Sequence, residues 1–136
     1  MSSASASNST GGEREDLAGL RVLVVEDAWH VAKALKSALE GFGMIVAGPI
    51  ARIVDAEQFL IDEMPDLALV DVNLKGEMAY GLIDRLVEKR IPVVVVSGYA
   101  VLPRSVDKAA AVLQKPFSGA QLLATLRHAM QMSKNS

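Results

Sequence analysis

Several apolar segments of this chain end abruptly in polar side chains. RVLVVED ends in Glu26 and Asp27, LALVDV carries Asp71, and PVVVVSGY carries Ser97. Further along, AVLQKPF places Lys115 directly before a proline. Ionised side chains are almost never fully buried unless they are paired. Buried strands that finish on acids therefore predict a polar site at one edge of a sheet.

Strand and helix patterns alternate along the chain. Apolar or β-branched runs predict strands at 21–25, 44–48, 66–71, a segment opened by Pro92, and 110–114. Apolar side chains at helical spacing predict helices at 29–42, 52–63, 79–89 and 118–132. Between the last two strands we expect only a short helical segment, which Pro103 interrupts.

This alternation predicts an α/β fold, with a five-stranded, doubly wound parallel sheet and helices on both faces. The flavodoxin-like strand order 2-1-3-4-5 makes the first and third strands neighbours at the switch point, where ligands bind beyond the carboxyl ends. Glu26, Asp27 and Asp71 should therefore converge, with Ser97 and Lys115 arriving from the next two strands.

Composition limits the class of protein. A chain of 136 residues, 51% hydrophobic and 22% charged, fits one soluble globular domain. The absence of cysteine excludes disulfides and thiolate metal sites, and a net charge of −2 without a basic cluster argues against DNA or membrane binding. We expect a cytoplasmic protein with a disordered tail at 1–16, one domain at 17–133 and no output domain.

The predicted cluster suggests phosphoryl chemistry. Two carboxylates about 4 Å apart repel by roughly 4 kcal/mol at an effective dielectric near 20, so three of them require a cation. An all-oxygen ligand set with open water positions suits Mg²⁺. Asp71 at its strand end could act as a nucleophile and form an aspartyl-phosphate, while Lys115 and nearby N–H groups stabilise the charge.

In this order and at these strand ends, the residues resemble the receiver domain of two-component response regulators (CheY-like) over roughly residues 20–131. The resemblance implies that Asp71 is phosphorylated and that Ser97 and Lys115 contact the phosphoryl group. It implies Mg²⁺ ligation by Asp27 directly, by Glu26 largely through water, by Asp71 and by the backbone carbonyl of Asn73. We also predict a role for Gly98 in ligand binding and a cis peptide bond before Pro116.

The stretches AGPI, DLALVDVNLKGE, IPVVVVSGYA and VLQKPF resemble a branch known as the FAT GUY receivers, which are typically single-domain regulators of alphaproteobacteria. The aromatic residue that many receivers place three positions before the lysine is replaced by Val112. The usual tyrosine switch therefore cannot operate unchanged, and Tyr99 is the alternative aromatic reporter. We expect activation to change amide exchange mainly in residues 98–112.

The resemblance implies a sensor histidine kinase or phosphotransfer protein as the phosphoryl donor. It further implies an output through binding to another protein, whose identity the sequence does not give, or through transfer of the phosphoryl group. We expect a monomer or a phosphorylation-dependent dimer, with no enzymatic activity beyond self-catalysed phosphotransfer and dephosphorylation.

Three alternative functions must be distinguished from this one. A flavodoxin-type electron carrier needs a phosphate-binding loop after the first strand, where two acids stand instead. A haloacid-dehalogenase-type phosphatase needs D-x-D after that strand, and VEDAW does not supply it. The third alternative, a phosphorylation-independent adaptor with the receiver fold, would have no need of the full set of polar residues.

Overall fold

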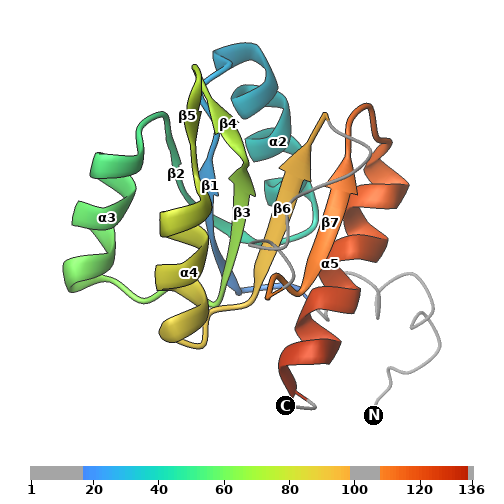
Figure 1. Cartoon of the computed structure of the whole chain (residues 1–136). Helices are drawn as coiled ribbons and strands as arrows, with labels where there is room; N and C mark the ends of the chain where they lie inside the picture. Colours follow the sequence, from blue (N-terminus) through green and yellow to red (C-terminus); the bar gives the residue numbers. More distant parts are fainter. Residues whose placement is uncertain (1–16, 99–107, 135–136) are drawn as a thin grey trace, which may run out of the picture.

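Five parallel strands form the central sheet of the computed structural model, which describes residues 17–98 and 108–134 (Figure 1). The strands are β1 (Arg21–Val25), β2 (Ile45–Ile50), β3 (Leu67–Asp71), β6 (Val93–Ser97) and β7 (Ala111–Gln114). Their order is β2-β1-β3-β6-β7, with every pair parallel. This confirms the predicted fold class and strand order.

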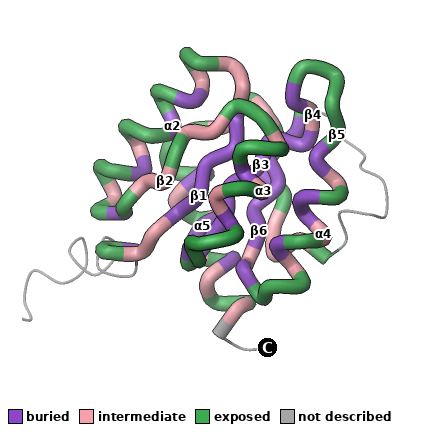
Figure 2. The backbone as a smooth tube through the Cα atoms, turned by 90° about the vertical axis from the view of Figure 1, so that its left-hand side faces the viewer, coloured by how far each residue is buried: buried purple, intermediate pink, exposed green. Residues whose placement is uncertain are grey.

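Helices cover both faces of the sheet (Figure 1). One core cluster joins the sheet to α2 (Trp29–Gly41) and α5 (Gly119–Lys134). The other joins it to α3 (Ile53–Asp62) and α4 (Tyr80–Glu88). Because both faces are covered, β3 and β6 are buried along their whole length, as Figure 2 shows, which explains their nearly continuous apolar sequences.

The predicted elements agree with the structure to within a few residues. The second strand continues through Gly48 and Pro49 to Ile50, and the last helix extends to Lys134. The expected disordered tail at 1–16 and the segment interrupted by Pro103 lie outside the described residues. No helix in the described part of the chain is long and apolar enough to cross a membrane.

A small hairpin follows β3, and the sequence patterns did not predict it. β4 (Asn73–Leu74) and β5 (Glu77–Met78) pair antiparallel across Lys75 and Gly76. Both central residues have positive φ, 52° and 85°, as in a type I′ turn. The side-chain oxygen of Asn73 accepts a hydrogen bond from the Gly76 N–H at 2.8 Å, which closes the turn.

The close approach of β2 to β1 requires glycine at position 48. A Cβ atom there would lie 2.8 Å from the Ile50 nitrogen and 2.9 Å from the Val24 carbonyl oxygen, and φ is +103°. The strand irregularity at this point still allows the Ile50 carbonyl to accept the Glu26 N–H at 2.9 Å. Gly48 therefore shapes the strand that supports the first acid of the predicted site.

Replacing Gly48 by alanine should lower the free energy of unfolding by about 1–3 kcal/mol, because the left-handed backbone and the two backbone contacts both oppose a Cβ. Urea unfolding would measure the loss. The matched control is Gly41→Ala at the end of α2, where a Cβ meets no atom within 4 Å and no positive φ is recorded. Equal unfolding midpoints for the two variants would contradict the role of Gly48.

Candidate functional site

Strand register brings the predicted site residues to one edge of the sheet. Val25 of β1 pairs with Val70 of β3. The next residues, Glu26 and Asp71, therefore lie at the carboxyl ends of these two neighbouring strands. Asp71 pairs with Val96, the residue before Ser97. Ser97 in turn pairs with Gln114, the residue before Lys115. Parallel pairing thus converts four distant positions in the sequence into one site.

Asp71 is buried, and both of its carboxylate oxygens are engaged. The Lys115 ammonium donates to Oδ2 at 2.9 Å, and the backbone N–H of Asn73 donates to Oδ1 at 3.0 Å. Burial by itself lowers the pKa of Lys115, but the hydrogen bond and charge of Asp71 outweigh it, so this pKa lies above its usual value. Lys115 is therefore a cation at any physiological pH.

Glu26 is also buried, and only one of its oxygens is hydrogen-bonded. Oε2 accepts the Ala28 N–H at 3.2 Å, just before the first turn of α2. Oε1 has no hydrogen-bond partner among the described residues and lies 3.7 Å from the Lys115 nitrogen. Burial, together with the negative charge of Asp71, raises the pKa of Glu26 to about 7.

These acids fit a divalent cation. Glu26, Asp27 and Asp71 each offer a carboxylate oxygen, and these oxygens lie within 4.8 Å of one another. Lys115 supplies a single positive charge, too little to balance three carboxylates. The Oε1 atom of Glu26, which accepts no hydrogen bond from the described residues, is a buried acceptor of the kind that a bound ion or its water shell satisfies. An all-oxygen set of this size suits Mg²⁺.

Ser97 lies at the end of β6, fully buried, and its backbone carbonyl accepts the Lys115 N–H at 2.8 Å. This bond fixes where the chain leaves β7 and hence where the lysine side chain begins. Gly98 follows as an exposed residue at the same edge. The structure therefore places Ser97 at the same edge of the sheet as Asp71, as predicted, with Gly98 directly after it. The roles predicted for both residues remain predictions.

The peptide bond between Lys115 and Pro116 is cis, which confirms that prediction. A second cis bond, between Gly48 and Pro49, was not predicted. Val112 lies on β7 and is 46% exposed. The other proposed switch residue, Tyr99, lies outside the described residues.

Sequence reasoning missed the way in which the hairpin after β3 supports Asp71. A hydrogen bond between Asn73 and Gly76 closes the turn. This turn holds Asn73 in place, and the backbone N–H of Asn73 donates to the Asp71 carboxylate. The available signal was Lys75-Gly76 between two short extended segments, since glycine readily supplies positive φ in a tight hairpin. Without a longer alternating pattern, that dipeptide did not distinguish a hairpin from a loop.

The raised pKa of Glu26 gives a testable pH dependence. Without Mg²⁺, between pH 4.5 and about 7 the unfolded chain has lost the Glu26 proton while the folded protein still binds it. The contribution of Glu26 to folding stability should therefore decrease as pH rises through this window. Urea unfolding in EDTA should show that Glu26→Gln removes this decrease, whereas Glu40→Gln on the exposed surface of α2 keeps it. Parallel stability curves for wild type and Glu26→Gln would contradict the prediction.

Comparisons with known proteins agree on one family. The model of the response regulator receiver domain matches residues 22–127. No curated protein has a significantly similar sequence.

Three crystal structures illustrate the similarity of fold. A CheY-like receiver domain from Methanospirillum hungatei is 24% identical with a TM-score of 0.76, covering 87% of this chain and 98% of the other. The receiver domain of a modulated diguanylate cyclase from Desulfovibrio desulfuricans is 25% identical with a TM-score of 0.75, covering 86% and 98%. The receiver domain of a sensor histidine kinase from Pseudomonas aeruginosa, with magnesium in its active-site cleft, is 21% identical with a TM-score of 0.74, covering 84% and 99%.

These matches do not separate the branches of the family, so membership of the FAT GUY branch remains a prediction. The family model spans most of the chain, and the fold and strand order agree with it. The chain therefore belongs to the response regulator receiver domain family.

Proposed function

We propose that Asp71 accepts a phosphoryl group from a phosphohistidine of a sensor kinase or phosphotransfer protein, in a reaction that requires Mg²⁺. The observation that carries the proposal is the environment of the Asp71 carboxylate. It lies between the Lys115 ammonium and the Asn73 N–H, within reach of two further acids. A carboxylate held only for structural reasons would need the ion pair but not the acidic cluster beside it.

The transfer breaks the bond between phosphorus and the imidazole nitrogen and forms a bond between phosphorus and an Asp71 oxygen. The electron pair of the broken bond stays on the imidazole, whose other ring nitrogen already carries a proton, so the ring leaves as neutral imidazole. The carboxylate loses its charge as its oxygen bonds to phosphorus, and the negative charge of the phosphoryl oxygens enters the site. Lys115, already 2.9 Å from Asp71, is placed to neutralise this charge, and the Ser97 hydroxyl is the proposed hydrogen-bond donor to the phosphoryl group.

For the metal site we propose Asp27, Asp71 and the Asn73 backbone carbonyl as direct ligands, with Glu26 acting through water. Mg²⁺ bound there would supply charge neutralisation for the phosphoryl oxygens. The solved receiver domain from Pseudomonas aeruginosa, which holds magnesium in its active-site cleft, supports this choice of ion. The hydrogen bond from the Gly76 N–H to the Asn73 side chain would keep the backbone carbonyl of Asn73 in place.

The phosphorylated chain would act by binding another protein or by passing the phosphoryl group on, rather than by turning over a substrate. This assigns it a signalling role and no enzymatic activity beyond self-catalysed phosphotransfer and dephosphorylation. The alternative is an adaptor whose binding to other proteins does not depend on phosphorylation. In such an adaptor the cluster of acids would have no function.

Incubation with Mg²⁺ and either acetyl phosphate or beryllofluoride should modify wild type and leave Asp71→Asn unmodified, because asparagine lacks the nucleophilic oxygen. Intact-mass spectrometry and ¹⁹F NMR provide the two measurements. Asp66→Asn is a control that removes an exposed acid which pairs with the Arg21 backbone N–H at 2.8 Å, away from the site. Equal modification of wild type and Asp71→Asn would refute the phosphoacceptor assignment.

Asp27→Ala should weaken Mg²⁺ binding more than Glu26→Ala, since Asp27 is the proposed direct ligand. The fluorescence of Trp29 can follow the titration, because its side chain is 72% exposed and stands two residues from Asp27. Lys33 lies 5.6 Å from the centre of the Trp29 ring, so Lys33→Met tests whether a signal change comes from that neighbour. Unchanged Mg²⁺ affinity in Asp27→Ala would show that the ligand assignment is wrong.

A further inference from the structure

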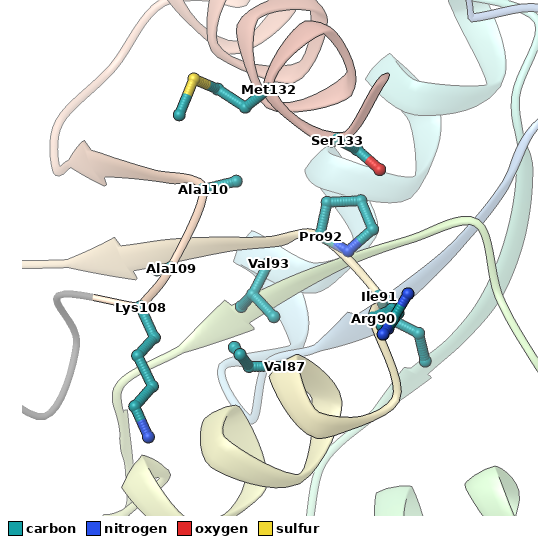
Figure 3. A pocket seen from close by; sticks show the side chains of 10 residues that line it. All are labelled: Val87, Arg90, Ile91, Pro92, Val93, Lys108, Ala109, Ala110, Met132 and Ser133. Carbon is teal, nitrogen blue, oxygen red and sulfur yellow. The ribbon is translucent and has the colours of Figure 1, made fainter. Parts of the chain in front are cut away.

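A groove lies at the amino edge of the sheet, opposite the site. Its volume is about 710 Å³, and it is formed by the end of α4, the starts of β6 and β7, and the end of α5. Figure 3 shows Met132 and Ser133 of α5 on one side and Val87 of α4 on the other, with Pro92 and Val93 between them. Most of its lining is apolar, and its size is in the range of binding sites rather than packing defects.

Among the described residues, the charged side chains that line this groove are both basic, Arg90 and Lys108, and none is a carboxylate. Both residues are exposed, and neither forms an ion pair with any described residue. An apolar surface with basic residues at its rim is complementary to an apolar surface that carries acids.

The same chain exposes an apolar surface that carries acids at the end of α3. At the end of α3, Ile61 and Met64 are 69% and 59% exposed, and Asp62 and Glu63 stand between them in sequence. Glu63 pairs with Arg21 at 3.0 Å, whereas Asp62 pairs with no described residue. We call Ile61–Met64 the α3 end, and Figure 2 shows α3 on the face turned to the viewer.

The two surfaces are placed for contact between copies. The α3 end lies near the start of β1, because Glu63 pairs with Arg21, and the groove lies farther along the sheet at the starts of β6 and β7. Because α3 runs back between two parallel strands, its last turn is at the amino edge, as is the groove. A copy shifted along the width of the sheet brings its α3 end to the neighbour's groove.

We propose that the groove receives the α3 end of a second copy of this chain, with Ile61 and Met64 on the apolar floor and Asp62 facing Lys108 and Arg90. This contact is heterologous, since each copy offers a different surface to each neighbour. The Asp71 site stays clear because it lies at the carboxyl edge. The tail at 1–16 fits less well, because it carries acids but Met1 is its one large apolar residue.

Sedimentation velocity over a range of protein concentrations tests the proposal. Wild type should self-associate, and Lys108→Glu or Asp62→Lys alone should weaken association by about tenfold or more, since like charges then face each other. The double variant Lys108→Glu/Asp62→Lys should restore association by exchanging the two charges. Lys36→Glu, an equal change of charge on the exposed surface of α2, should behave as wild type.

An equimolar mixture of the two single variants gives the sharpest result. The Lys108→Glu chain keeps a working α3 end, and the Asp62→Lys chain keeps a working groove. The mixture should therefore associate as wild type does, with the two kinds of chain alternating, because every groove then faces an α3 end of opposite charge. Asp71→Asn should associate as wild type does, so failure of the phosphoacceptor proposal would leave this result unchanged.

Several results would overturn the proposal. They are a wild type that stays monomeric at all concentrations, a double variant that fails to regain association, or a mixture that does not associate. Association that is lost in Lys36→Glu to the same degree would show a general charge effect instead. Circular dichroism of each variant confirms that the exposed substitutions leave the fold intact.

Discussion

Lys115 bonds to Asp71 at 2.9 Å, and this ion pair balances charges that would otherwise drive the site apart. Three carboxylates offer oxygens within 4.8 Å of one another, and each close pair repels by roughly 4 kcal/mol at an effective dielectric near 20. One ammonium group cannot compensate fully, and burial together with the charge of Asp71 raises the pKa of Glu26 to about 7. The same imbalance is what makes the site attractive to a divalent cation.

The rest of the fold serves to hold these charges at fixed distances. β3 and β6 are buried on both faces, so neither can shift without opening a core cluster. Backbone bonds then fix the strand ends. The Glu26 N–H binds the Ile50 carbonyl, and the Lys115 N–H binds the Ser97 carbonyl. Gly48 permits the bond between Glu26 and Ile50, because a larger residue would not fit there. The hairpin closed by Asn73 and Gly76 supports the N–H that binds Asp71.

The sheet also separates two kinds of surface. Its carboxyl edge carries the acids of the proposed phosphoryl site. Its amino edge carries the groove with Arg90 and Lys108 and the acidic α3 end, where Glu63 pairs with Arg21. Because these edges are a strand length apart, the proposed contact between copies at one edge leaves the other accessible. Separate substitutions therefore test the two proposals independently.

The amino-acid sequence by itself determined the α/β class, the five strands and the residues of the site. Buried strands and amphipathic helices leave local patterns, and acids that end apolar runs stand out against them. The tertiary structure decided which groups touch, because contacts depend on register and side-chain direction. The choice of Asp71 over Glu26 as the close partner of Lys115, the Glu26 oxygen that accepts no hydrogen bond from the described residues and the hairpin at Lys75-Gly76 belong to this second group. The groove was also decided by the tertiary structure, because its walls come from residues 87–93, 108–110 and 132–133. These segments are distant in the sequence, and no local pattern encodes the space that packing leaves between them.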